Sequence, residues 1–147
     1  MKNYYPYSKR DAIKNYFPIP NEVFSLGLTP GEISVYCYLM YRENRKTHQC
    51  HPSYKTIGKA LQMSTNTVKK YVDSLREKHL ITTEPTEVIT RGGIKRNGNL
   101  LCTIRPVEEA LRYHLETQLQ NAKEEQERLR RIAALEAYDR AHPKTAF

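Results

Sequence analysis

The side chains best suited to bind another molecule lie in one short segment near the middle of the chain. When residues 65–78 are placed on a helix, Val68, Val72 and Leu75 cluster on one side. The opposite side is amide, hydroxyl and basic in its first half, whereas its second half carries Asp73 and Glu77. The candidate contacts in this segment are Thr65, Asn66, Thr67, Lys69, Lys70 and Arg76.

These residue types match the exposed groups of double-stranded DNA. The Asn66 amide has the donor–acceptor pair that fits an adenine edge, and lysines reach guanine acceptors or phosphates. Acidic side chains repel phosphates, so we expect the first half of the helix to enter the major groove. Arg76, at the flank, is a candidate phosphate contact. The alternative is an ordinary solvated helix face.

Two further segments offer phosphate contacts. Ser53, Tyr54 and Lys55 open the preceding helix, where free backbone N–H groups and a lysine charge suit an anion. Ser53 can equally serve only as the helix N-cap. Beyond the helices, the glycine-rich stretch RGGIKRNG carries Arg91, Lys95 and Arg96, which can lie along the DNA backbone or in the minor groove unless it is only a basic hairpin.

Other chemistry finds little support in the sequence. The run His48-Gln49-Cys50-His51 suggests a metal, but no second close cysteine or paired histidine follows to complete a tetrahedral zinc site. Phosphate-binding glycine loops, nucleophile elbows and HExxH motifs are absent from the sequence. The tyrosines lack the surrounding arginine and histidine cluster that strand transfer needs. We therefore expect a protein that is not an enzyme and has no metal or cofactor.

The positive charge is concentrated in particular segments. The chain has 147 residues and a formal net charge of +8. Residues 51–81 carry six basic and two acidic side chains, whereas residues 106–147 carry seven and eight. Residues 1–20 and 82–105 are also net basic. A phosphate backbone is the partner that this distribution favours over a merely soluble basic surface.

The elements that position these residues form a helix-turn-helix. Ser64 is placed as the N-cap of the helix from Thr65 to about Lys78, and an earlier helix begins after Ser53. Gln62 occupies the turn position that is often glycine, so we expect a slightly altered turn. The apolar residues expected to pack together are Ile57, Ala60, Leu61, Met63, Val68, Val72 and Leu75.

The flanking segments extend this motif to a winged helix. Thr29-Pro30-Gly31-Glu32 predicts the start of a core helix, with Thr29 as N-cap and Glu32 closing a capping box. Residues 44–52 are expected to be a loop, and 80–83 are β-prone. Residues 87–90 and 99–104 are predicted to be the two strands of a hairpin. The fold class is mainly α with a small β-hairpin, a winged helix-turn-helix followed by a long C-terminal helix.

Four regions follow from this assignment. Residues 1–20 are an extended basic and aromatic arm, either a disordered terminus or a DNA contact through Lys9, Arg10 and Lys14. Residues 21–106 are the DNA-binding domain. Residues 107–140 are a helix with leucines at spacings of three and four, able to pair with a second copy despite a polar gap. Residues 141–147 are a disordered tail.

The chain resembles the winged helix-turn-helix DNA-binding proteins of low-GC Gram-positive bacteria and their mobile elements, including the N-terminal domains of plasmid replication initiators. The resemblance covers about residues 16–110 and lies in FPIPNEVFSLGLTPGEISVYCYL, HPSYKTIGKALQMSTNTVKKYVDSLREKHLI and TRGGIKRNGNLLCTIRP. It implies a winged-helix fold and DNA binding. It does not distinguish a regulator from a replication factor.

We therefore expect a cytoplasmic homodimer, without a membrane segment, that binds double-stranded DNA sequence-specifically as a transcriptional regulator. No stretch approaches the roughly 20 apolar residues of a membrane helix. The three cysteines are widely spaced, which fits reduced thiols. A replication-initiation or partition factor could use the same domain. A protein-interaction winged helix without DNA binding is the alternative from another class.

Overall fold

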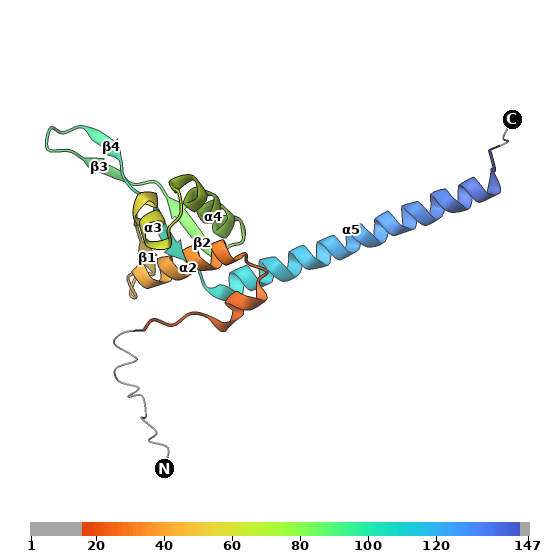
Figure 1. Cartoon of the computed structure of the whole chain (residues 1–147), viewed down its shortest axis with the longest axis horizontal. Helices are drawn as coiled ribbons and strands as arrows, with labels where there is room; N and C mark the ends of the chain where they lie inside the picture. The colour runs from red at the N-terminus through yellow and green to blue at the C-terminus, as the bar shows by residue number, and fades with distance from the viewer. Residues whose placement is uncertain (1–15, 145–147) are drawn as a thin grey trace, which may run out of the picture. The chain divides into compact units, whose positions relative to one another are not determined.

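Three helices form the helical part of the domain, and the predicted core helix is at its centre (Figure 1). The computed structural model describes residues 16–144. A short 3-10 helix, η1 (Asn21–Ser25), comes first and was not expected from the sequence; it buries Val23. Helix α2 (Pro30–Arg42) follows, with Val35, Tyr36 and Leu39 buried, as expected for a helix that is apolar nearly all round.

Helix α2 begins after the predicted N-cap, Thr29, but the capping box is only half formed, because the Glu32 side chain binds the Thr29 hydroxyl and Lys78 instead of the Thr29 backbone N–H. The Thr29 side chain accepts a hydrogen bond from the backbone N–H of Glu32, and Pro30 stands at the first helical position. Glu32 is only 5% exposed, and its carboxylate accepts a hydrogen bond from the Thr29 hydroxyl at 3.2 Å. It also accepts from Nζ of Lys78 at 2.7 Å. This ion pair connects the start of α2 to the end of the third helix.

The helix-turn-helix is confirmed as α3 (Tyr54–Leu61) and α4 (Thr65–Glu77). Gln62 takes the left-handed conformation, with φ 56° and ψ 47°, so the turn keeps the geometry that usually calls for glycine. The expected alteration of the turn was wrong. The backbone N–H groups of Gln62 and Met63 both donate to the Gly58 carbonyl, which closes the turn.

The predicted apolar set is only partly buried. Ile57, Val68, Val72 and Leu75 are at most 1% exposed, and Leu61 and Met63 pack half-buried against them. Ala60 is exposed, contrary to expectation.

Strand pairing differs from the predicted hairpin. The strands are β1 (Gln49–Cys50), β2 (Ile81–Glu84), β3 (Glu87–Ile89), β4 (Lys95–Asn97) and β5 (Leu101–Ile104). The segment predicted to pair with residues 87–90 is instead β5, which lies between β1 and β2 in an antiparallel sheet. The partner of β3 is β4, in the stretch expected to be the hairpin tip. Residues 44–52, expected to be a loop, contain β1.

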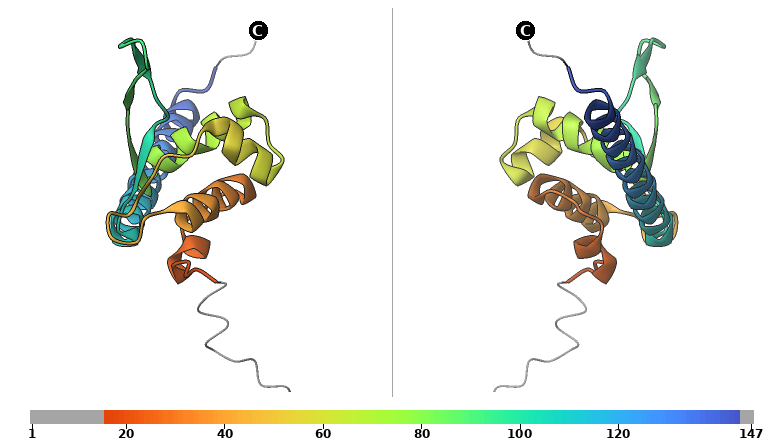
Figure 2. Two further views of the ribbon diagram at one scale, coloured as in Figure 1. Left: turned by 90° about the vertical axis from the view of Figure 1, so that its left-hand side faces the viewer. Right: turned by 90° about the vertical axis from the view of Figure 1, so that its right-hand side faces the viewer.

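Burial explains this pairing. Cys102 and Ile104 of β5 are 3% and 9% exposed, so this strand belongs on the core. Strands β3 and β4 are exposed throughout, and their hairpin extends beyond α2, α3 and α4 in the views of Figure 2. Gly98 connects β4 to the core sheet, and its N–H donates to the Thr86 carbonyl at 2.7 Å. The fold is therefore a winged helix-turn-helix whose wing is a separate two-stranded ribbon.

The last helix, α5 (Val107–Ala141), confirms the predicted long C-terminal helix. Its first residues belong to the compact unit that ends at Leu111, where Ala110 is 2% exposed and Val107 and Leu111 pack against the core. Residues from Arg112 onward form the second unit, and every residue from 115 to 144 is exposed. Of the predicted arm, residues 16–20 have no regular secondary structure and residues 1–15 lie outside the described residues, as does the tail from residue 145.

Candidate nucleic-acid interface

Helix α4 presents its polar face because its apolar face is fixed in the core. Ser64 caps the helix by accepting a hydrogen bond from the backbone N–H of Thr67 at 3.2 Å. The buried Val68 and Val72 then set the rotation of the helix, which leaves Asn66, Lys69 and Lys70 exposed. A shallow open groove follows this face and is lined by Asn66, Lys69, Lys70, Asp73, Ser74 and Glu77.

The charged side chains in the two halves of this helix face have different contacts within the protein. Asp73 accepts from Nη2 of Arg76 at 3.3 Å, and Nη1 of Arg76 donates to the Thr83 hydroxyl at 3.4 Å. Arg76 is therefore held towards its own helix and β2. In the first half, Nζ of Lys70 lies 5.9 Å from the centre of the Tyr71 ring, a cation–π contact that leaves its charge accessible.

The two threonines at the start of α4 differ. Thr65 is exposed, whereas the Thr67 hydroxyl is half-buried and lies 2.8 Å from the Ser64 hydroxyl. Thr67 therefore helps to cap the helix. Of this pair, Thr65 has the side chain that a ligand can reach.

At the start of α3 the Ser53 side chain caps the helix. The Ser53 hydroxyl accepts from the backbone N–H of Thr56 at 3.0 Å and lies 2.8 Å from the Thr56 hydroxyl. The N-cap interpretation of Ser53 is thus confirmed, and its side chain is occupied. Lys55 is exposed at the second position of the helix, where its charge adds to the positive end of the helix dipole.

Tyr54, the first residue of α3, lies between the core and the second half of α4. Its ring packs half-buried against the core. Burial raises the pKa of the Tyr54 hydroxyl, the nearby Asp73 carboxylate raises it further, and the Arg76 guanidinium lowers it. The start of α3 therefore lies within electrostatic reach of the second half of α4.

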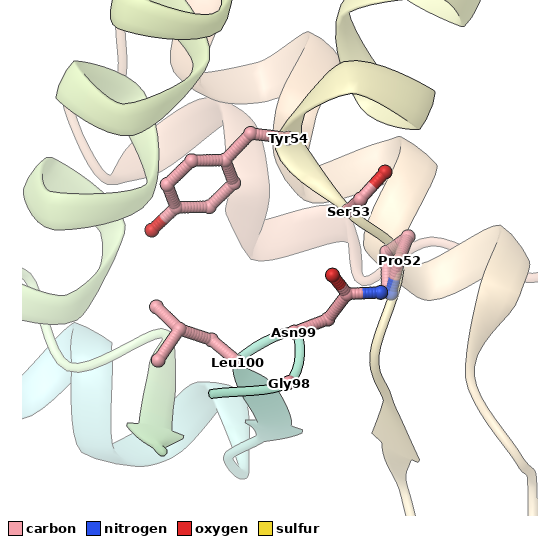
Figure 3. A pocket seen from close by; sticks show the side chains of 6 residues that line it. All are labelled: Pro52, Ser53, Tyr54, Gly98, Asn99 and Leu100. Atoms are coloured by element: carbon pink, nitrogen blue, oxygen red, sulfur yellow. The ribbon is translucent and has the colours of Figure 1, made fainter. Parts of the chain in front are cut away.

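A cavity of about 200 Å³ connects the start of α3 with the base of the wing. Figure 3 shows the Tyr54 ring above Leu100, with the Asn99 amide directed towards Pro52. Nδ2 of Asn99 donates to the His51 carbonyl at 3.2 Å, which leaves its Oδ1 without a hydrogen bond among the described residues. The sequence did not single out Asn99, because nothing in its local pattern indicates that residues 51 and 99 are neighbours.

The wing carries three basic residues, one in the loop that closes it and two on strand β4. Backbone bonds join Thr90 to Ile94 and Gly93 to Thr90, and Gly93 has φ +78°, which glycine adopts without strain. Arg91 is exposed in this loop. Lys95 and Arg96 lie on opposite faces of the ribbon, because they are neighbours on one strand. Lys95 is paired with Ile89, and Arg96 is paired with Val88.

The two faces of the wing also differ in charge. Nζ of Lys95 lies 4.0 Å from Oε2 of Glu87, whose carboxylate partly neutralises that face. No ion pair of Arg96 occurs in the described part of the chain, and its face carries the exposed Val88. The face with Arg96 is therefore the more suitable one for a phosphate.

Residues 16–144 contain neither a cluster of metal-ligating side chains nor a helix that could span a membrane. His48, Cys50 and His51 do not come together as a group of ligands, and no three such side chains within this range could hold a metal ion. Over the same range, none of the helices is both long enough and apolar enough to cross a membrane.

Comparisons with known proteins agree with the helix-turn-helix. A helix-turn-helix domain family matches residues 26–81. A search of curated proteins found no match. Among solved structures, a possible transcriptional regulator from Methanosarcina mazei Go1 is 17% identical with a TM-score of 0.49, covering 85% of this chain and 88% of that one.

Two further structures are similar at lower scores. A MarR-like transcriptional regulator from Thermotoga maritima is 17% identical with a TM-score of 0.41, covering 89% of this chain and 91% of that one. A MepR mutant from S. aureus bound to an oligodeoxyribonucleotide is 18% identical with a TM-score of 0.39, covering 89% and 88%. The family match places a helix-turn-helix domain at residues 26–81, which contain α2, α3 and α4.

Proposed function

We propose that this chain is a sequence-specific double-stranded DNA-binding protein that acts in the cytoplasm as a homodimeric transcriptional regulator of a mobile element or chromosomal locus. The observation that carries the proposal is the exposed first half of α4, where Asn66, Lys69 and Lys70 line an open groove. Those three side chains offer one amide and two ammonium groups to base edges and phosphates.

The roles of the remaining residues follow from their contacts. Thr65 and Asn66 contact bases, while Lys69 and Lys70 reach bases or phosphates. Lys55 and the free N–H groups at the start of α3 hold one phosphate. On the wing, Arg91 and Arg96 hold others. Ser53, Thr67 and Arg76 contribute less to DNA binding than their types predict, because each already has partners within the protein.

The protein-interaction alternative has less support. A docking helix would expose large apolar side chains. In the part of the chain that the structure describes, none of the largely exposed big apolar side chains lies on α4. Such side chains occur instead on the wing, on α5 and at Tyr16, Phe24 and Tyr41.

Replication initiation or partition at an origin would use the same DNA contacts. No described contact favours it over regulation. The sequence selected by the protein distinguishes the two roles, since a regulator selects a site beside a promoter and an initiator selects repeats at an origin.

Binding-site selection followed by salt titration tests the proposal. The logarithm of the association constant should fall linearly with the logarithm of salt, with a slope of about −0.9 per phosphate contact. Affinity that is absent, or indifferent to salt, would refute DNA binding.

Two classes of variant separate base contacts from phosphate contacts. Asn66→Ala should lose about 1–3 kcal/mol of discrimination at one base position. Arg96→Ala should weaken all duplexes alike and reduce the salt slope by about 0.9. Lys69→Ala should weaken binding, whereas the matched Lys144→Ala, an exposed lysine beyond the end of α5, should leave affinity unchanged.

A further inference from the structure

The wing is tied to the helices by very few polar contacts. Its strands β3 and β4 are exposed at every position, so burial does not fix the direction of the ribbon. Within residues 16–144, a single hydrogen bond joins residues 85–100 to the helical part, residues 30–77. In this bond Nδ2 of Asn99 donates to the His51 carbonyl at 3.2 Å. The Asn99 amide is therefore the polar connection between the wing and the helices.

The junction between the wing and the core sheet is a β-bulge. The core sheet ends with Glu84 paired to Leu101. The wing begins where the backbone N–H of Gly98 donates to the Thr86 carbonyl at 2.7 Å. One residue, Pro85, is thus left opposite the two residues between Gly98 and Leu101. A bulge interrupts the ladder and bends the strand, and a proline has no N–H to donate across it. The backbone ladder therefore does not carry the direction of the core sheet into the wing.

Asn99 lies in this bulge and connects it to the segment that leads into α3. Its own carbonyl accepts a hydrogen bond from the Thr86 hydroxyl, which holds the bulge to the first strand of the wing. The pairing of β1 with β5 ends with Cys50 opposite Cys102, and His51 is the next residue. The Asn99 side chain thus extends this ladder by one bond at the point where the backbone of the wing bends away.

The space beside this bond is open, so packing cannot replace it. Tyr54 and Leu100 line a cavity of about 200 Å³ between the start of α3 and the base of the wing, and their side chains face each other in Figure 3. Asn99 is itself exposed. Without its hydrogen bond, the ribbon could turn about the bulge while the buried core stayed packed.

We propose that Asn99 is a positioning residue for DNA binding, which sets the direction of the wing so that Arg91 and Arg96 reach the same duplex as α4. This inference rests on the proposed function and names a residue that acts through the two arginines without contacting DNA. When the competent direction of the wing is populated for only part of the time, the apparent affinity falls by that fraction.

Double electron–electron resonance on the full chain measures the direction of the wing without DNA. The spin labels are attached to ketone-bearing amino acids at position 59 of α3 and position 92 of the wing loop, so the three native cysteines do not react. Lys59 is exposed, and a side chain at Gly92 would meet no atom within 4 Å.

We expect Asn99→Ala to broaden the distribution of distances between the two labels. Asn97→Ala is the matched control, because it removes an exposed asparagine of β4 and leaves the bond to His51 intact. A distribution that Asn99→Ala leaves as narrow as Asn97→Ala does would overturn the inference, whether or not the protein binds DNA.

Duplex binding then tests whether this direction matters for DNA. Asn99→Ala should weaken binding to the selected duplex roughly three- to tenfold, the net worth of about one hydrogen bond. In a chain that already carries Arg91→Ala and Arg96→Ala, the same substitution should change affinity by less than about twofold, because the wing no longer contributes.

The two measurements separate this inference from the proposed function. An equal loss of affinity in both backgrounds, or no loss in either, would overturn the positioning role of Asn99. If the unsubstituted chain bound no duplex, the proposed function would be refuted, and the label distances would still decide whether Asn99 holds the wing.

Discussion

The ion pair between Glu32 and Lys78 allows a quantitative test of how α4 is held on the domain. The Glu32 side chain is 6% exposed and the Lys78 side chain 33% exposed, with their charged atoms 2.7 Å apart. Replacing Lys78 with methionine keeps a side chain of similar length but leaves the carboxylate of Glu32 with only the Thr29 hydroxyl. Removing one partner of a fully buried pair costs about 3–5 kcal/mol.

The cost should be lower here because Lys78 is partly exposed and water can reach the space it leaves. We expect Lys78→Met to reduce the free energy of unfolding by about 2–3 kcal/mol. For a domain of this size that corresponds to a fall in Tm of roughly 8–20 °C. The double variant Glu32→Gln, Lys78→Met should recover part of the loss, because it removes the uncompensated charge.

Urea unfolding followed by circular dichroism measures this loss. Lys95→Met is the matched control, since it makes the same substitution in an exposed ion pair of 4.0 Å and should cost less than about 0.5 kcal/mol. If Lys78→Met cost no more than Lys95→Met, the buried pair would contribute nothing beyond an ordinary surface salt bridge, and the reasoning would be refuted.

Three further predictions concern the turn, the groove and the core. Gln62→Gly should stabilise the domain by about 0.5–1 kcal/mol in thermal unfolding, since glycine adopts φ 56° without strain; a lower Tm would contradict this. Asp73→Asn should strengthen binding to random duplexes and steepen the salt slope, because it removes a repulsive charge and releases Arg76; an unchanged slope would mean that Arg76 does not reach DNA. Stability should fall as pH rises above about 9, because burial raises the pKa of Cys50 from 9.0 to about 12 and that of Tyr36 from 10.0 to about 12. In this pH range the folded state holds protons that the unfolded state releases, so the urea midpoint of unfolding should decrease between pH 9 and 12. A midpoint that stays constant over this range would contradict the predicted loss of stability.

The helices of this protein were predictable because their signals are local. Thr29, Ser53 and Ser64 each cap the helix that follows, as their spacing predicted. The apolar positions of α4 are all buried, so the face with Asn66 and Lys69 could be identified before its surroundings were known. A cap and a helical period involve residues only three or four positions apart, and tertiary contacts did not override them.

Strand pairing was not predictable from the same local patterns. Residues 99–104 are β-prone, but only the core decides that β5 pairs with β1 and β2, up to 54 positions away in sequence, as between Gln49 and Thr103. The wing consequently has β4 as its second strand, which places Lys95 and Arg96 on opposite faces. A period of two is common to every strand and does not specify its partner.

By itself, the sequence determined that this is a basic helix-turn-helix chain with a polar first half on α4 and a long C-terminal helix, because caps, periodicity and charge are encoded over a few residues. The tertiary structure decided which of the candidate side chains are accessible. It gives Ser53, Thr67 and Arg76 hydrogen-bond partners within the protein and brings Asn99 beside the start of α3. Within residues 16–144 it gives Arg96 no ion pair. The physical reason is that a hydrogen bond depends on distance in space, which only the packing of distant segments sets.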